Sequence, residues 1–308
     1  MSTTETDTVA VAPADLSPAD IDRRVYDLYD EYCHGHIDRR EFLRRCGAIT
    51  VAGVSGLAMA QALMPRYAEA AQVNFNDERI VPEYVEYDSP GGTSGRMRGY
   101  LVKPAGDGPF PAVLVIHENR GLNPYIEDVA RRFALAGFVA LAPDGLFPVG
   151  GYPGNDDAGR ELQKGLDQGE LKVDMLNSAR FLKEHEASTG RLGATGFCWG
   201  GGTVNWLATE MGADLAAGVP FYGAAADAEA VPGIEAALLI QFAEDDERIN
   251  SMWPEFEAAL EEHDVSHEAH FYPGTRHGFH NDSTPRFSPE QAEIAERRMM
   301  EFFAERLG

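Results

Sequence analysis

The chain of 308 residues is 44% hydrophobic and 25% charged, a globular composition that can bury a sizeable core in one large domain or two small ones. Its 50 acidic residues outnumber 26 basic ones, and the formal net charge is -24. Because so acidic a surface repels polyanions, we exclude nucleic acid and anionic lipid as partners.

Residues 1–71 carry the pattern of an export signal. Arg39 and Arg40 stand in the segment "DRREFLRR", an uncharged and mildly apolar run follows, and Ala68 and Ala70 have the spacing of a cleavage site. The arginine pair with the following Phe-Leu resembles a twin-arginine signal, which implies contact with the export machinery and a periplasmic or extracellular location. A basic surface helix would explain the same residues without export, and the protein would then stay in the cytoplasm.

The remainder, residues 72–308, alternates between strand and helix patterns in a single predicted domain. Segments 81–90 and 97–104 flank the turn "GGTSG" and predict a hairpin. Further strands are predicted at 110–118, 138–144, 191–197, 216–223, 236–246 and 266–274, and helices at 125–137, 174–185, 201–211, 253–263 and 288–307. This order predicts an α/β fold with a mostly parallel central sheet and helices on both faces.

Two sequence patterns resemble metal or phosphate sites but do not meet the requirements of such sites. His267 and His270 in "HEAH" point to opposite faces of a predicted strand, and no HExxH motif is present. The Gly/Pro-rich loop at 145–156 lacks the Gly-Lys-Ser/Thr of a phosphate loop and does not open onto a helix pattern. We therefore expect neither a metal nor a cofactor.

The stretch "GATGFCWGGG" has the outline of the Gly-x-Ser-x-Gly nucleophile turn, with Cys198 in place of serine. It lies between a predicted strand and a predicted helix, the context that such a turn requires, and Gly196 and Gly200 leave room beside it. The positive end of the helix would favour the thiolate, and the N–H of Trp199 would form half of an oxyanion hole. Taken alone, the motif fits a small buried cysteine in a glycine-rich turn equally well.

Residues downstream supply the partners that a nucleophile needs. The segment "AEDDERIN" follows a predicted buried strand and offers Asp245 and Asp246, and His277 lies in a loop before the last helix. The order nucleophile, acid, histidine is that of the α/β-hydrolase fold, in which the histidine accepts the proton and the acid holds its tautomer. The residues therefore predict a thiol-dependent hydrolase.

The segments "HENRGL", "GFCWGG", "DDERIN" and "YPGTRHGFHND" resemble the dienelactone hydrolase family, which comprises carboxymethylenebutenolidases with an α/β-hydrolase fold and a cysteine nucleophile. The resemblance implies a triad of Cys198, Asp246 and His277, with Asp245 as the second choice of acid. It also implies that Glu118 holds the resting thiol. The alternative for Glu118 is a carboxylate paired with Arg120 in a surface loop.

The resemblance implies further roles around the triad, with Asn119 N–H as the second oxyanion donor. The family binds its substrate carboxylate with arginines, whereas this chain has Asn281 at one such place. Arg120 and Arg286 are the candidate substitutes, and Phe279 is a candidate for an apolar wall. We therefore expect a monomeric hydrolase of a small ester or lactone. A broad thiol carboxylesterase or peptidase is the alternative, and so is a non-catalytic binding protein of the same fold.

Overall fold

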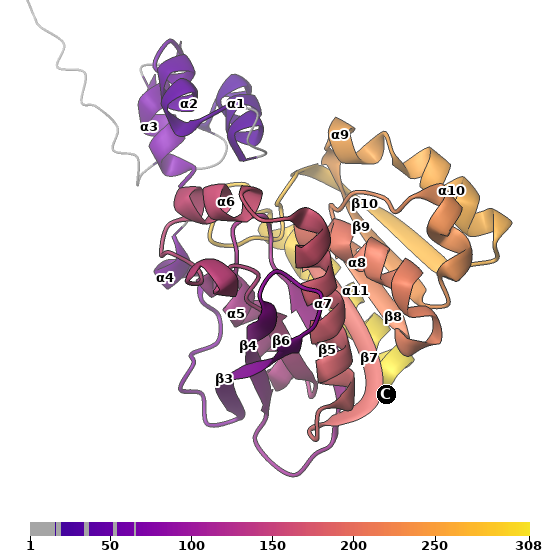
Figure 1. Ribbon diagram of the computed structural model, residues 1–308. Helices are drawn as coiled ribbons and strands as arrows, with labels where there is room; N and C mark the ends of the chain where they lie inside the picture. The colour runs from indigo at the N-terminus through magenta and orange to yellow at the C-terminus, as the bar shows by residue number, and fades with distance from the viewer. Residues whose placement is uncertain (1–15, 17–19, 34–36, 52–53, 65) are drawn as a thin grey trace, which may run out of the picture.

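The structure, a computed structural model, describes residues 16, 20–33, 37–51, 54–64 and 66–308. Its core is an eight-stranded sheet with the strand order β10-β9-β8-β7-β5-β6-β4-β3 (Figure 1). The strands are β3 (Ile80–Ser89), β4 (Gly95–Pro104), β5 (Phe110–Ile116), β6 (Val139–Pro143), β7 (Ser188–Phe197), β8 (Ala217–Phe221), β9 (Ala237–Asp245) and β10 (His267–Arg276). Strands β3 and β4 form the predicted hairpin, and β4 also pairs antiparallel with β6, whereas the other neighbours are parallel.

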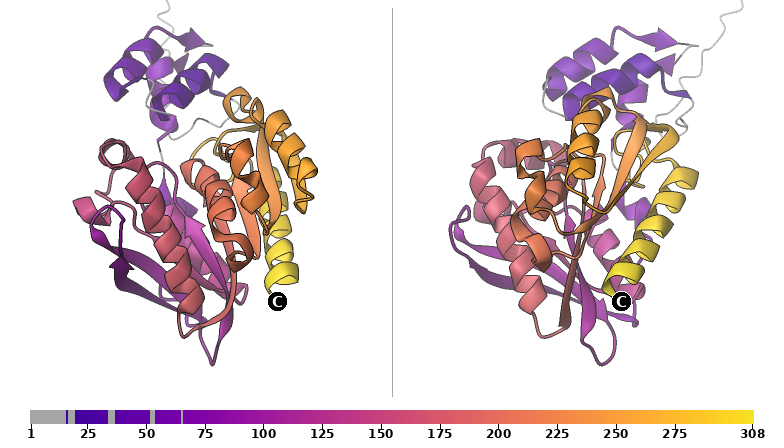
Figure 2. Two further views of the ribbon diagram at one scale, coloured as in Figure 1. Left: turned by 45° about the vertical axis from the view of Figure 1, so that its right-hand side comes forward. Right: turned by 90° about the vertical axis from the view of Figure 1, so that its right-hand side faces the viewer.

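Helices cover the two faces of this sheet, and each face buries its own apolar cluster. Helices α7 (Gln168–Glu184), α8 (Trp199–Met211) and α10 (Trp253–Glu262) cover one face, and α5 (Pro124–Leu135) and α11 (Pro289–Leu307) cover the other. Short helices α6 (Asp156–Lys164) and α9 (Glu247–Asn250) lie at one end of the sheet (Figure 2). The predicted α/β-hydrolase fold class is confirmed.

The parallel strands place the candidate site residues together. Because β5, β7, β9 and β10 run in the same direction, the residues that follow them meet at one edge of the sheet. Glu118, Cys198, Asp246 and His277 each follow one of these strands within two residues. Segments that lie 159 positions apart in the sequence, from residue 118 to residue 277, therefore converge on a single site.

Helices α6 and α9 of the hydrolase domain were not predicted, and α6 is the longer of the two. Helix α6 begins directly after the glycine-rich loop, where Asn155 caps it by accepting hydrogen bonds from the N–H groups of Asp157 and Ala158. The expectation that this loop does not open onto a helix is therefore wrong. The reason is that α6 buries Gly159, Arg160 and Gln163 rather than apolar side chains, so it has no apolar periodicity to read.

The N-terminal residues form a small helical unit with its own core. Helices α1 (Arg23–Cys33), α2 (Arg39–Cys46) and α3 (Gly56–Ala62), with the two-residue strands β1 (Thr50–Val51) and β2 (Val54–Ser55), surround an apolar cluster of their own. Phe42 is fully buried there and stacks on Tyr32 at 4.9 Å between ring centroids. Helix α4 (Tyr67–Ala70) then leads into the hydrolase domain.

The predicted export signal falls within this unit. Arg39 and Arg40 lie exposed in the first turn of α2, whereas the side chain of Ala68, in the predicted cleavage site, lies outside the described residues. Within the described part of the chain, no helix combines the length and apolar character of a membrane span. Export stays a prediction at this point.

Candidate active site

Cys198 occupies a strained turn between β7 and α8. Its φ of 56° and ψ of -113° lie in a backbone region that non-glycine residues rarely adopt. The strand and helix approach so closely that a Cβ on Gly196 would meet Gly200 O at 2.4 Å, and a Cβ on Gly200 would meet Ile116 O at 2.4 Å. The two glycines therefore allow the sharp turn, which directs the cysteine side chain out of the sheet edge.

His277 and Asp246 form the strongest polar contact of the site. His277 Nδ1 lies 2.6 Å from Asp246 Oδ2, and both side chains are at most 5% exposed. The neighbouring Asp245 is exposed and pairs instead with Arg276 at 3.2 Å. Of the two acids considered, Asp246 is thus the one that contacts His277.

The surroundings of His277 favour its protonated form. Burial lowers the pKa of His277, but the charges of Cys198 and Asp246, and hydrogen bonds to both, raise it by more. The pKa therefore lies above the ordinary value for histidine. Both Cys198 and Asp246 therefore act on the imidazole, and Nδ1 contacts the carboxylate, as expected of a base that serves a thiol.

Glu118 is buried beside the same groups. It is 2% exposed and accepts a hydrogen bond from Asn281 Nδ2 at 3.0 Å. The alternative placed Glu118 in a surface loop beside Arg120, whereas both side chains are buried, and Arg120 pairs with Asp156 at 2.8 Å. Burial raises the pKa of Tyr222, and the charges of Glu118 and Cys198 raise it further.

His117 fixes the backbone that carries Glu118 and Asn119. Its Nε2 accepts a hydrogen bond from Gly145 N–H at 3.2 Å, so its Nδ1 carries the proton and donates to Glu118 O at 2.6 Å. Burial lowers the pKa of His117, which keeps the ring neutral and able to make both bonds. His117 therefore holds the loop in which Asn119 N–H was expected to serve as an oxyanion donor.

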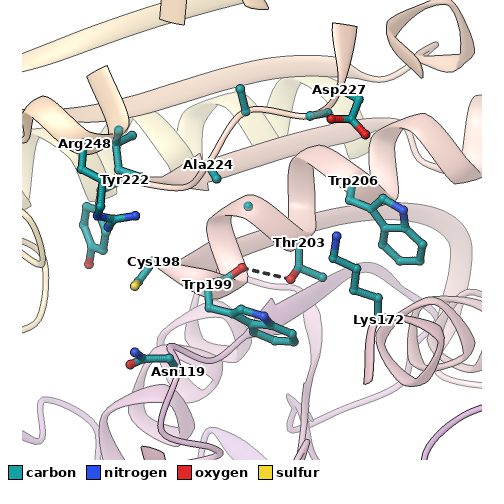
Figure 3. A pocket seen from close by; sticks show the side chains of 14 residues that line it. Asn119, Lys172, Cys198, Trp199, Thr203, Trp206, Tyr222, Ala224, Asp227 and Arg248 are labelled. Atoms are coloured by element: carbon teal, nitrogen blue, oxygen red, sulfur yellow. Dashed lines mark hydrogen bonds between the residues drawn. The ribbon is translucent and has the colours of Figure 1, made fainter. Parts of the chain in front are cut away.

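A cavity of about 370 Å³ opens in front of the thiol. Figure 3 shows Cys198 and Asn119 at one end, Lys172 and Trp206 at the other, and Trp199 between them. The ammonium of Lys172 lies 5.4 Å from the centre of the Trp206 ring. The lining also includes Thr203, Tyr222, three alanines at 224–226, Asp227, Arg248 and Ile249. The cavity is thus largely apolar with a few charged groups, as small-molecule sites usually are.

Three residues that we expected to contact substrate lie elsewhere. Phe279 is fully buried among aromatic rings, including Tyr272 at 5.0 Å. Arg120 borders a second cavity together with Asp156, and Arg286 packs over the ring of Tyr29 at 5.0 Å. Their side chains do not line the cavity at Cys198. A part for them in substrate binding stays a prediction.

Sequence reasoning did not identify several residues that line the cavity. Lys172, Trp206 and Asp227 were not singled out, because helical periodicity does not reveal which partly exposed positions border a cavity. Arg248 belongs to the segment "DDERIN", in which only the acids were considered as site residues. Among the described residues, no cluster of three or more His, Cys, Asp or Glu side chains could hold a metal ion.

Comparison with known proteins places this site in a family. The family model described as the dienelactone hydrolase family matches residues 97–307. The chain belongs to the dienelactone hydrolase family. A second model, described as YqhI-like, matches residues 13–50 in the N-terminal extension. The protein is therefore a hydrolase of esters or lactones with an additional N-terminal segment.

Individual relatives agree with this assignment. A protein of Escherichia coli K12 named "Putative hydrolase fragment YghX" is 64% identical over 115 residues, which are 37% of this chain and 97% of that protein. A "Putative carboxymethylenebutenolidase" of the same organism is 30% identical over 244 residues, covering 74% of this chain and 88% of that protein. The crystal structure named "Putative Dienelactone Hydrolase" from Klebsiella pneumoniae has a TM-score of 0.63 at 26% identity and covers 73% of this chain and 99% of its own.

The raised pKa of His277 gives a prediction for the pH dependence. A protonated His277 cannot accept a proton, so we expect kcat/KM to fall toward acid with a midpoint above about 6.5, the ordinary histidine value. Asp246→Asn removes a charge that raises this pKa. The midpoint should therefore move to lower pH, and kcat should fall by roughly a hundredfold or more.

The measurement is a pH–rate profile with a p-nitrophenyl ester. Glu247→Gln, at the exposed neighbouring position, is the control and should leave the profile unchanged. An acid limb that stays in place in Asp246→Asn would contradict the assignment of this limb to His277.

Proposed function

We propose that this protein hydrolyses a small ester or lactone with Cys198 as nucleophile, His277 as base and Asp246 as the acid that orients the histidine. The observation that supports this proposal most is the 2.6 Å contact between Asp246 and His277 at the strand edge that also carries the strained Cys198 turn. This arrangement supports the proposal, because nucleophilic catalysis needs a base that an acid orients and that lies close to the nucleophile.

The first half of the reaction forms a thioester. The Cys198 thiol transfers its proton to His277, and the thiolate adds to the substrate carbonyl carbon. The negative oxygen that results accepts hydrogen bonds from the N–H groups of Asn119 and Trp199. The tetrahedral intermediate then expels the alcohol oxygen, which takes the proton from His277. When the substrate is a lactone, this alcohol stays attached to the acyl group.

The second half releases the acid. His277 takes a proton from a water molecule, and the hydroxide adds to the thioester carbonyl carbon. The new tetrahedral intermediate expels the Cys198 sulfur, which recovers the proton from His277. Asp246 stabilises the imidazolium that forms in both halves, and the enzyme returns to its starting protonation state.

Glu118 controls the thiol between turnovers in this proposal. Its buried negative charge would oppose a second negative charge on the Cys198 sulfur, which would protect the resting thiol from oxidation. The hydrogen bond from Asn281 to Glu118 Oε2 supports this role, because it holds the carboxylate in the site. The same bond supports the view that Asn281 fixes Glu118 rather than binding a substrate carboxylate.

A panel of p-nitrophenyl esters, lactones and peptides tests the proposed reaction. We expect the wild type to hydrolyse esters or lactones, and Cys198→Ala to reduce the rate to background while the circular dichroism spectrum stays native. Cys198→Ser is the matched variant, since it keeps a nucleophilic atom of similar size. Activity of the alanine variant near that of wild type, or a preference for peptides, would contradict the proposal.

Glu118→Gln tests the control of the thiol. Removing the carboxylate charge favours the thiolate, so iodoacetamide should alkylate Cys198 faster, and the pH at half-maximal rate should fall. The glutamine can still accept the hydrogen bond from Asn281, which keeps the loop in place. Glu261→Gln on the exposed face of α10 is the control. An unchanged pH profile of alkylation would contradict the role of Glu118.

We also propose that the N-terminal segment directs export through the twin-arginine route. The paired arginines, the weakly apolar run and the exposure of Arg39 and Arg40 on α2 support this location. Export and cleavage are separate events, and the proposal concerns export alone.

Replacing Arg39 and Arg40 by lysine should therefore retain the protein in the cytoplasm, because the export machinery reads the arginine pair. Cell fractionation with mass measurement of the N-terminus is the test, and Arg44→Lys with Arg45→Lys at the other end of α2 is the matched control. A wild type that stays in the cytoplasm at full length would contradict export.

A further inference from the structure

Two side-chain pairs bridge the loops that follow β9 and β10. Asp246 binds His277 at 2.6 Å. The last residues of the two strands form a second pair, in which Asp245 lies 3.2 Å from Arg276. The two pairs are therefore adjacent in sequence in both segments. Any force that moves Asp245 or Arg276 also moves the backbone of the candidate acid or base.

Helix α1 of the N-terminal unit contacts both residues of this second pair. Arg23 reaches Asp245 at 3.5 Å, and Asp27 lies 3.3 Å from Arg276. The ring of Tyr26, between them on the helix, has the Arg276 guanidinium 5.0 Å from its centre. Three residues of α1 thus hold two residues that directly precede Asp246 and His277.

Contacts between α1 and the hydrolase domain continue along one face of the helix. Tyr26, Tyr29 and Tyr32 are spaced by three residues, and each has one arginine of the hydrolase domain over its ring. These arginines are Arg276 at 5.0 Å, Arg286 at 5.0 Å and Arg160 at 4.1 Å. Figures 1 and 2 show α1 to α3 above the end of the sheet where α6 and α9 lie. The helix therefore spans the loops on both sides of the site.

The loop that begins with His277 makes several close contacts. The Arg286 guanidinium packs against Gly278, where an added Cβ would lie 2.9 Å from Arg286 Nη2. Further along the same loop, Ser283 O accepts a hydrogen bond from Arg66 N–H at 2.6 Å, and Pro285 O accepts one from Tyr26 Oη at 3.4 Å. The segment that begins with His277 is therefore held between α1 and the linker to the hydrolase domain.

Helix α1 does not shape the substrate cavity itself. All residues that line the cavity at Cys198 lie between positions 119 and 249, in the hydrolase domain. A contribution of α1 to activity should therefore appear in the orientation of the catalytic groups and not in contact with substrate. This distinction separates a positioning helix from a wall of the binding site.

We propose that helix α1 is a positioning element of the active site, in which Arg23, Tyr26 and Asp27 hold the Asp245–Arg276 pair and thereby keep His277 aligned with Asp246 and Cys198. This inference rests on the proposed cysteine hydrolase function. It requires that the N-terminal unit stays on the working enzyme, so the mature chain retains residues 23–32.

The strengths of the contacts determine which variants to make. The pairs of Arg23 and Asp27 involve side chains that are 71% and 54% exposed, and such pairs contribute little each. The ring of Tyr26 is buried against Arg276 and contributes more. A variant that removes all three interactions therefore tests the proposal most strongly.

The experiment compares full-length variants in steady-state hydrolysis of a p-nitrophenyl ester that the wild type accepts. The test variant carries Arg23→Gln, Tyr26→Leu and Asp27→Asn. The control carries Asp22→Asn and Arg24→Gln, a pair from the same end of α1 whose side chains bind each other at 2.8 Å. Both sets leave the net charge unchanged. Tyr26→Phe keeps the ring over Arg276 but removes the hydrogen bond to Pro285 O, so it should lose less activity than the test variant.

We expect kcat of the test variant to fall roughly tenfold, because small misalignments of catalytic groups carry large rate penalties. KM should stay within about twofold, since no residue of α1 lines the cavity at Cys198. The acid limb of the pH profile should shift to lower pH, as the weaker contact with Asp246 lowers the pKa of His277. The control should match wild type in all three values.

Several results would overturn the proposal. These are an unchanged kcat in the folded test variant, an equal loss in the control, or a raised KM with normal kcat, which would make α1 a wall of the substrate site. If the test variant fails to fold, Arg23→Gln with Asp27→Asn replaces it, because both side chains are exposed. The kcat of this variant should fall roughly threefold. An unchanged kcat would overturn the proposal.

A second readout separates this inference from the proposed function. If the wild type hydrolyses none of the esters or lactones, the proposed function fails, but iodoacetamide still reports on Cys198 and its histidine. The pH profile of alkylation should then differ between wild type and the test variant and agree between wild type and the control. Identical profiles in all three would overturn the positioning role of α1.

Discussion

The site depends on the sharp turn at Cys198. A residue with φ of 56° between a buried strand and a helix can exist here because Gly196 and Gly200 let the two elements approach within contact distance of backbone oxygens. That approach places the thiol at the strand edge and the first turn of α8 beneath it. The other groups come to the same end of the sheet because the strands that they follow are parallel.

The contacts around the turn fall into two shells with different physical roles. His277, Asp246 and Glu118 are buried. His277 binds Asp246 at 2.6 Å, and Glu118 accepts a hydrogen bond from Asn281 at 3.0 Å, so these contacts form at low effective dielectric. Asp245 and Arg276 lie outside them and are partly exposed, so their pairing is weaker. Helix α1 adds aromatic and ionic contacts to this outer pair, which is why an N-terminal extension bears on a site built by the hydrolase domain.

Most of the hydrolase fold and its central residues could be predicted from the sequence. Buried parallel strands are continuous apolar runs, and the glycine-flanked Cys198 is a local signal that needs no tertiary information. Helix α6 was missed because its buried residues include the polar Arg160 and Gln163, which leave no apolar periodicity. Lys172 and Trp206 were missed because a position on an amphipathic helix does not tell which neighbour it faces. The tyrosines of α1 form a regular pattern, but the arginines over them come from two distant segments, α6 with Arg160 and the end of β10 and its loop with Arg276 and Arg286.

The most direct test of the account is a search for the acyl-enzyme. Wild-type protein is mixed with a slowly hydrolysed ester and quenched in acid, and its intact mass and peptide map are then measured. The account predicts a mass gain equal to the acyl group on the peptide that contains Cys198, removed by neutral hydroxylamine as expected of a thioester. An enzyme that turns over the ester with no adduct at Cys198, or with the acyl group on another residue, would contradict a cysteine nucleophile.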